Sequence, residues 1–330
     1  MAPRLQYFFS TGSRYSFLSM SQVPALERRF GVSFDWIPVN GKRIRQLRGV
    51  DPFAGPPQSG QYDWGYRERD AQAWASHYGI EFREPQDVTF DVEAWLCGVI
   101  AAARQGDVRA YAWDLAQEVF ARGTWPLGVE TTLEVACRHN LDLVQFEADV
   151  LAPQTASQLE QNCRDAVAAG AFGTPTLLVG EDLYWGNDRL VLVDHRLRQA
   201  QAARAQLEAL EVLGIDHVVL NSSAPEQLVE FYSTMLGLRL ERSVGDFLWQ
   251  FRLGDQLLDI FRAERTGTNV DHICLRVRPF DMQAMCAALE AADIPYEPAQ
   301  RIYGAQGFGP SVYIKDPQGN RIELKGAITA

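Results

Sequence analysis

The last third of the chain contains an internal repeat, and this feature restricts the possible fold more than any other. The hexapeptide Ile-Asp-His-Val-Val-Leu at 215–220 returns as Val-Asp-His-Ile-Cys-Leu at 270–275. Each copy begins as a strand, continues with an amphipathic helix and ends in further strands. The helices are expected at 225–236 and 280–292, and the closing strands at 257–261 and 321–325. The repeat therefore predicts two β-α-β-β-β modules.

Both modules carry a histidine in the first strand and a carboxylate in the last. The histidines are His217 and His272, and the carboxylates are Asp259 and Glu323. Because side chains alternate between the two faces of a strand, facing strands can bring these groups onto one ion. Two imidazoles with one or two carboxylates suit Fe, Mn, Zn or Ni and leave positions for a substrate. A lone strand histidine is more often structural, but matched Asp-His pairs in both copies favour a divalent metal site.

This part of the chain resembles the vicinal oxygen chelate superfamily, which includes glyoxalase I, extradiol dioxygenases and resistance proteins for fosfomycin and bleomycin. Besides the Asp-His pairs, the matching motifs are Phe-Tyr-x3-Leu-Gly-Leu at 231–238 and Asp-Pro-x-Gly-Asn-x-Ile-Glu-Leu at 316–324. The resemblance implies a metal held by His217, His272 and Glu323. Asp259 falls where glyoxalase I has a glutamate ligand, but its shorter side chain leaves a three-residue ligand set as the alternative. The glycine-rich stretch 303–309 is expected to form a loop that covers the site.

The first 200 residues have a different pattern, that of a thioredoxin-like α/β domain with a helical insertion. A strand at 7–9 leads through a turn into a helix that should continue to residue 30, and a second strand follows at 32–39. The Gly/Pro-rich stretch 51–57 is expected to be a loop. A helical block from 66 to about 162 then precedes Thr174-Pro175. Strands at 176–179 and 183–185 and a helix to about 210 complete the expected order.

Three separated motifs make the resemblance of this half more specific. They are Ser-Arg-Tyr-Ser-Phe-Leu at 13–18, Gly-Ala-Phe-Gly-Thr-Pro-Thr at 170–176 and Tyr-Trp-Gly-Asn-Asp-Arg-Leu at 184–190. In this order they resemble the family of 2-hydroxychromene-2-carboxylate isomerases and kappa-class glutathione transferases, which has a DsbA-like fold. DsbA-type proteins have a Cys-Pro-His-Cys turn where this chain has Ser13 to Ser16. Because both cysteines are absent, thiol–disulfide exchange is excluded.

The resemblance implies a glutathione site around Ser13, whose hydroxyl would bind the sulfur and lower the pKa of the thiol together with the helix N-terminus. The other implied contacts are Thr174 and the cis Pro175 to the cysteinyl backbone, and Asn187, Asp188 and Arg189 at the γ-glutamyl end. In the alternative readings, Ser13 is an ordinary helix cap and Asp188-Arg189 an ordinary helix start.

Two positions depart from the family pattern. Arg14 replaces the usual proline and could stabilise the thiolate, bind a substrate carboxylate or point to solvent. The asparagine and lysine that the family carries before the helical insertion have no match around 54–63.

The length of the chain predicts two domains, with boundaries expected at 1–208 and 213–330. The 330-residue chain has a net charge of −11, which argues against nucleic acid or an anionic membrane as a partner. No apolar segment is long enough to span a bilayer, and the first residues contain no apolar signal core, so a cytoplasmic protein is expected. Both resembled families commonly form homodimers, which we also expect here. The five cysteines form no CxxC motif and should be reduced.

The two resemblances together predict a bifunctional enzyme for small molecules. The first domain would isomerise a double bond of an aromatic or unsaturated oxo-acid with glutathione, and the second would use a divalent metal on a related compound. Two alternatives stay open. The chain could be a glutathione transferase or lyase with a glyoxalase-I-like second domain, or the metal domain could sequester a ligand without turnover.

Overall fold

The computed structural model describes residues 4–49, 64–85, 92–123, 128–264 and 269–327, which form two compact units. One unit is Arg4–Leu197 and the other begins at Arg198, within a long helix, α10 (Leu190–Glu208). The expected loop at 51–57 and the 54–63 stretch without the family's Asn and Lys lie outside the described residues. None of the described helices is long and apolar enough to cross a membrane.

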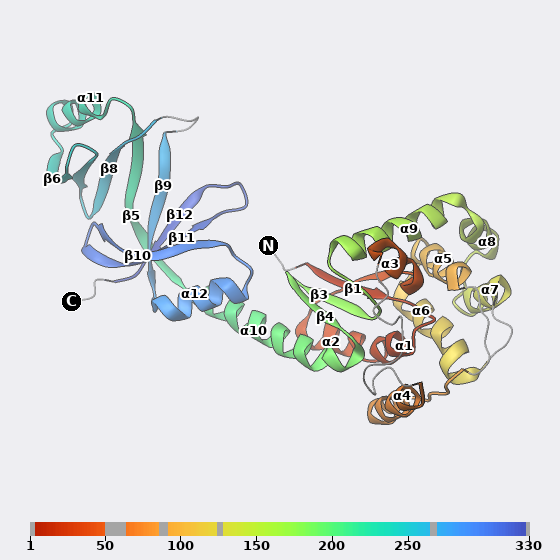
Figure 1. Ribbon diagram of the computed structural model, residues 1–330. Coiled ribbons are helices and arrows are strands. Elements are labelled where there is room, and N and C mark those ends of the chain that lie inside the picture. Colours follow the sequence, from red (N-terminus) through yellow and green to blue (C-terminus); the bar gives the residue numbers. More distant parts are fainter. Residues whose placement is uncertain (1–3, 50–63, 86–91, 124–127, 265–268, 328–330) are drawn as a thin grey trace. The chain divides into compact units, whose positions relative to one another are not determined.

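A four-stranded sheet forms the centre of the first unit (Figure 1). Its order is β2-β1-β3-β4, with β1 parallel to β2 and antiparallel to β3. All five residues of β1 are buried, as expected for an apolar central strand. The arrangement confirms the predicted thioredoxin-like fold. The strands are β1 (Leu5–Phe9), β2 (Asp35–Pro38), β3 (Thr176–Val179) and β4 (Asp182–Trp185).

The helix expected up to residue 30 is in fact two helices, α1 (Arg14–Met20) and α2 (Val23–Phe30). Pro24 explains the break, because it lacks an N–H and its ring would clash with the carbonyl four residues earlier. The helical insertion is confirmed. The remaining helices before β3 are α3 (Gly41–Arg48), α4 (Trp64–Tyr78), α5 (Val92–Ala103), α6 (Val108–Gln117), α7 (Val129–Arg138), α8 (Leu143–Leu151) and α9 (Pro153–Ala168), with a π-helical segment, Glu118–Arg122, after α6.

The second unit contains an eight-stranded sheet in the order β10-β11-β12-β9-β5-β8-β7-β6. The first strand of each module pairs in parallel with the last (β5 with β8, β9 with β12), and β5 joins the modules by antiparallel pairing with β9. The predicted pair of β-α-β-β-β modules is thereby confirmed. The elements are β5 (Glu211–Ser222), α11 (Pro225–Glu230), β6 (Arg239–Val244), β7 (Leu248–Leu253), β8 (Gln256–Arg262), β9 (Val270–Arg278), α12 (Met282–Ala291), β10 (Tyr296–Gly304), β11 (Gly307–Lys315) and β12 (Arg321–Lys325).

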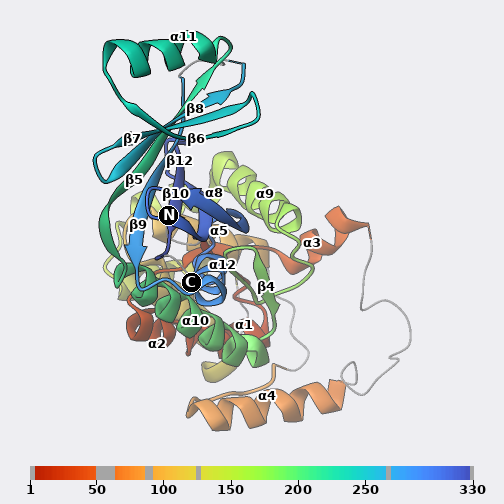
Figure 2. The same cartoon turned by 90° about the vertical axis from the view of Figure 1, so that its left-hand side faces the viewer.

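Two details of this unit differ from the prediction. The helix expected at 225–236 is α-helical only in α11 and continues as a π-helical segment, Phe231–Met235. Helix α11 lies beside β8 (Figure 2). The expected loop at 303–309 is instead the tip of a β-hairpin, in which Tyr303 pairs with Phe308 and Gly304 with Gly307. Gly307 has a φ of +116°, a conformation that allows so tight a turn.

Candidate functional site

The turn between β1 and α1 places Ser13 at the N-cap of α1. Its Oγ accepts a hydrogen bond from the Ser16 N–H at 3.3 Å and donates to the Thr174 carbonyl at 3.4 Å. The Thr174–Pro175 peptide bond is cis. The structure therefore brings together Ser13 and the Thr-Pro pair, which are 161 residues apart in sequence. Both hydrogen bonds of the hydroxyl are long and hence weak.

The residues that follow Ser13 are fixed by hydrogen bonds within the turn and to α4. The Ser16 hydroxyl, fully buried, accepts a hydrogen bond from the Ser10 N–H at 3.2 Å, so this residue stabilises the turn. The Tyr15 hydroxyl donates to Asp70 at 2.9 Å, which ties α4 to the turn. Burial and the Asp70 carboxylate raise the pKa of Tyr15 to about 12.

Arg14 forms an ion pair with Glu84, with 2.6 Å between Nη2 and Oε1. The two side chains are only 13% and 12% exposed, so Arg14 does not point to solvent. Burial lowers the pKa of Arg14 and raises the pKa of Glu84, because each charge loses hydration. Sequence reasoning missed Glu84 because it lies 70 residues further along the chain, and no local signal marks it.

The third predicted motif begins at the end of β4, which pairs with β3. The Gly186 N–H donates to the Pro175 carbonyl at 3.0 Å, and this contact connects the motif to the cis bond. Asn187 is buried, and its Nδ2 has no hydrogen-bond partner among the described residues. Asp188 and Arg189 pair with each other at 3.4 Å, and their side chains are 45% and 54% exposed. Asn187 therefore presents a buried donor, whereas the two charged residues lie at the surface.

A groove of about 510 Å³ lies next to this motif. Helices α2 and α4 and the start of α10 form its walls, which include the aromatic residues Trp74 and Tyr78. Asn187 and Asp188 line the groove, while Ser13 and Thr174 are not among its described lining residues. The predicted glutathione residues are thus divided between the Ser13 turn and this groove.

In the second unit, His217, His272 and Glu323 converge from β5, β9 and β12. The three donor atoms form a nearly equilateral triangle. Its sides are 3.4 Å between the two Nε2 atoms, 3.2 Å from His272 Nε2 to Glu323 Oε2, and 3.3 Å from His217 Nε2 to the same oxygen. The centre of such a triangle lies about 2 Å from each corner, which is a metal–ligand bond length. The three predicted residues are therefore close enough to bind one ion, and we call this side of the sheet the metal face.

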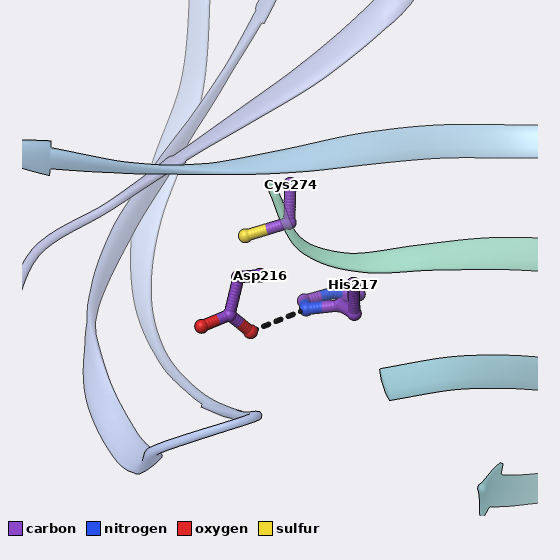
Figure 3. A group of neighbouring side chains, drawn as sticks. All are labelled: Asp216, His217 and Cys274. Carbon is purple, nitrogen blue, oxygen red and sulfur yellow. Dashed lines mark hydrogen bonds and ion pairs between the residues drawn. The ribbon is translucent and has the colours of Figure 1, made fainter. Parts of the chain in front are cut away.

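Each of the two histidines is oriented by the aspartate that precedes it. Asp216 Oδ1 lies 2.9 Å from His217 Nδ1, and Asp271 Oδ1 lies 2.7 Å from His272 Nδ1 (Figure 3 for the first pair). Neighbouring residues of a regular strand point to opposite faces, but the β5–β9 pairing is irregular at both aspartates. These irregularities allow Asp and His to meet. An aspartate on Nδ1 keeps the lone pair of Nε2 directed at an ion.

The charges of this cluster favour a cation at its centre. Burial alone would lower the pKa of His217, but hydrogen bonds with Asp216, Cys274 and Glu323 raise it to about 12. The pKa of His272 is likewise raised by Asp271 and Glu323 against the effect of burial. The two imidazoles in turn hold the pKa of Glu323 well below its usual range despite burial. At neutral pH this donor set therefore binds either protons or a metal ion.

Asp259, the fourth predicted ligand, lies on the metal face but outside the group of three. Its Cα pairs in register with Val219 of β5, which itself pairs with His272. Its Oδ2 accepts a hydrogen bond from Gln250 at 2.7 Å, and its buried Oδ1 has no partner among the described residues. Burial raises the pKa of this carboxyl. Gln250, which sequence reasoning missed, breaks the apolar pattern of β7 and is 1% exposed.

Cys274 is a further residue of the metal face that the sequence did not single out. It is fully buried and lies close to Asp216 and His217 (Figure 3). Burial raises the pKa of its thiol to about 12. Cys274 is therefore a neutral thiol beside the first histidine, consistent with the expectation of reduced cysteines.

Comparison with known proteins supports both halves of this description. Residues 4–198 match the DSBA-like thioredoxin domain, and residues 214–324 match the Glyoxalase/Bleomycin resistance protein/Dioxygenase superfamily. These matches confirm the predicted fold class. They also confirm the fusion of the two domains that the sequence motifs indicate.

Several relatives of the first unit share a name. Two proteins named 2-hydroxychromene-2-carboxylate isomerase, from Sphingobium xenophagum and Pseudomonas putida, are 22% and 21% identical to the chain over 211 residues. The matches cover 60% and 62% of the chain and 99% of each relative. A solved structure of a 2-hydroxychromene-2-carboxylate isomerase matches with a TM-score of 0.53 and 21% identity, covering 62% of this chain and 98% of that one. The prediction of an isomerase-type enzyme agrees with these names.

Proposed function

Because the chain belongs to the DSBA-like thioredoxin domain family and lacks both redox cysteines of the turn, we propose that its first unit is a glutathione-dependent isomerase. The substrate would be a small aromatic or unsaturated oxo-acid, as the name of its relatives suggests. The contact between the Ser13 hydroxyl and the cis Thr174–Pro175 segment carries this proposal.

Glutathione, when bound, supplies a thiolate that can add to a conjugated double bond and leave again after rotation about the single bond. Ser13 would donate its hydroxyl hydrogen to the sulfur. A hydroxyl has only one hydrogen, which now points to the Thr174 carbonyl at 3.4 Å. Because that bond is long, turning the hydroxyl toward a thiolate costs little and yields a stronger, charge-assisted bond.

The ends of glutathione would be held by the second and third motifs. The backbone of Thr174 and Pro175 suits the cysteinyl amide. The Nδ2 of Asn187, which has no hydrogen-bond partner among the described residues, suits a carboxylate oxygen. Asp188, which lines the groove, can form an ion pair with an ammonium group there. Since Glu84 already compensates the charge of Arg14, we assign Arg14 to stabilising the turn rather than to binding a substrate carboxylate.

A Ser13→Ala variant tests this proposal. Losing a hydrogen bond to a charged atom should lower kcat of glutathione-dependent isomerisation about 10- to 100-fold. Ser21→Ala is the control, because the Ser21 hydroxyl at the end of the same helix makes only local contacts among the described residues. It donates to the Leu18 carbonyl at 2.7 Å and accepts from Gln22 Nε2 at 3.0 Å. Full activity of the Ser13 variant would refute the role of Ser13. Recovery of free glutathione would separate an isomerase from a transferase, which leaves a conjugate.

For the second unit, we propose a metal-dependent activity on a related compound with two neighbouring oxygen atoms. His217, His272 and Glu323 would hold the ion. A divalent metal, when bound, supplies a Lewis acid that polarises the substrate oxygens. Asp216 and Asp271 orient the two imidazoles. Asp259 Oδ1, which has no partner in the described part of the chain, offers a buried acceptor nearby.

Metal binding tests the second part directly. Wild-type protein should bind one Mn(II) per chain, and Glu323→Gln should lose it. Glu290→Gln, an exposed position on α12, is the matched control. Equal Mn(II) binding by wild type and the Glu323 variant would refute the site.

A further inference from the structure

Arg242 lies on the metal face, although it is three strands away from His217. The paired residues of neighbouring strands point to the same side, and the register runs from Arg242 to Gln250, from Gln250 to Asp259 and from Asp259 to Val219. Val219 and His217 lie two residues apart on β5 and share a face. Arg242 therefore projects on the same side of the sheet as the metal ligands.

A chain of hydrogen bonds connects Arg242 with the neighbourhood of the ligands. Its Nη1 donates to Gln250 Oε1 at 3.4 Å, and Gln250 Nε2 donates to Asp259 Oδ2 at 2.7 Å. The amide of Gln250 is thus oriented by Asp259 and presents its oxygen to the guanidinium. A buried glutamine between these two groups positions the arginine relative to the metal face.

Two aromatic rings pack against the guanidinium. Its Cζ lies 4.6 Å from the ring centre of Tyr303 and 5.5 Å from that of Phe308, both at the tip of the β10–β11 hairpin. Nearby, Arg252 Nη1 donates to the Ala305 carbonyl at 2.9 Å. The strands at the two edges of the sheet therefore meet around Arg242. Ring contacts use the flat faces of a guanidinium and leave its in-plane N–H groups free to bind oxygen.

Arg242 has no carboxylate partner among the described residues, and this distinguishes it from most arginines of the unit. The arginines of the unit with a described carboxylate partner are Arg204, Arg239, Arg252, Arg262, Arg278 and Arg321. In a chain with a net charge of −11, an arginine that is partly buried, stacked on two rings and without a carboxylate partner in the described ranges is unusual. Its five donors, of which one binds Gln250, suit a planar anion.

We propose that Arg242 is the anchor for the carboxylate of the second unit's substrate. The ligand would bind the metal through two neighbouring oxygens at one end and Arg242 through a carboxylate at the other. Adjacent strands are about 4.8 Å apart, so β6 and β5 are separated by roughly 14 Å along the sheet. Because the long side chain of Arg242 extends from β6, the remaining distance between its guanidinium and the metal ligands is short enough for an aromatic acid to span. The inference rests on the proposed metal site and narrows its substrate to an anion.

The test uses full-length protein loaded with Mn(II) and four probes that share a vicinal diol. The probes are catechol, 3,4-dihydroxybenzoate, 3,4-dihydroxyphenylacetate and 3-(3,4-dihydroxyphenyl)propanoate, and their affinities are measured by calorimetry. At least one acid should bind wild-type protein about tenfold or more tightly than catechol. Arg242→Met should reduce this preference to about twofold or less, with catechol and Mn(II) affinity unchanged. Arg242→Lys should retain part of it.

Arg239→Met is the matched control, because Arg239 lies on the same strand, is exposed and pairs with Glu241. It should keep the wild-type preference. The anchor is refuted if no acid is preferred over catechol, if no probe binds, or if Arg242→Met keeps the preference. If Mn(II) still binds in those cases, only the anchor is refuted and the proposed metal site is not. If wild-type protein does not bind Mn(II), both the proposed function of the second unit and the anchor are refuted.

Discussion

Asp216→Asn is the substitution that most closely examines how the metal site is built. It keeps the shape of the side chain at the irregularity in β5 and removes only its charge. The carboxylate is 1% exposed and accepts two hydrogen bonds, from His217 Nδ1 at 2.9 Å and from the Ala305 N–H at 2.8 Å. Both bonds go to Oδ1, so the amide oxygen of asparagine can still accept them, but it does so without a negative charge. The bond that fixes the ring of His217 and directs Nε2 to the ion is then a weaker, neutral one.

The expected loss follows from the type of bond. A hydrogen bond with a charged partner contributes about 1.5–3 kcal/mol, against about 1 kcal/mol for a neutral one. The difference corresponds to a loss of metal affinity of about 10-fold, and removal of such an orienting residue typically costs about 10- to 100-fold. We expect the Kd of Mn(II) to rise within that range.

Titration of the full-length protein with Mn(II), followed by the electron paramagnetic resonance signal of free Mn(II), measures this change. Asp281→Asn is the control, because Asp281 caps α12 through a bond from the Ala284 N–H at 2.8 Å and asparagine caps helices equally well. Unchanged Mn(II) affinity in Asp216→Asn would refute the orienting role. An equal loss in both variants would show that the effect is not specific to the site.

Three further predictions concern both units. Because His217 and His272 have raised pKa values, an ion must displace protons, and Mn(II) affinity should rise with pH by up to about tenfold per pH unit for each proton released between about pH 6 and 8; binding independent of pH would contradict this. Glu84→Gln removes the charge that pairs with Arg14 and should lower the free energy of unfolding by about 1–3 kcal/mol in urea denaturation, and an unchanged midpoint would refute the pairing's importance. Gly186→Ala should destabilise more than Gly31→Ala, because Gly186 has φ +108° and ψ 155°, a region that is essentially restricted to glycine, whereas Gly31 has the left-handed values φ +63° and ψ 35°; equal unfolding midpoints would contradict the backbone argument.

The fold was predictable because its signals are repeated or well separated in the sequence. The 55-residue repeat around His217 and His272 is enough to predict two modules, since each copy carries the same order of strand, helix and strands. The break between α1 and α2 was missed, although Pro24 disfavours a continuous helix at this point. The hairpin at 303–309 was not predicted because glycines are common to loops and tight turns alike.

The ligands of the metal site could be predicted from the sequence, but most of the contacts around them could not. A histidine and a carboxylate at matching repeat positions indicate the three donors, but strict alternation along a strand places Asp216 on the opposite face from His217. Only the irregular pairing in the sheet brings them together. The partner of Arg14 and the role of Gln250 depend on contacts between distant segments. Such contacts leave no trace in a local pattern.

The central claim is that one chain carries a glutathione site in its first unit and a metal site in its second. Calorimetric titration of the full-length protein with glutathione and with Mn(II) tests this most directly. The account predicts one equivalent of each per chain, with Glu323→Gln losing Mn(II) and still binding glutathione. Binding of neither ligand, or retention of Mn(II) by the Glu323 variant, would contradict it.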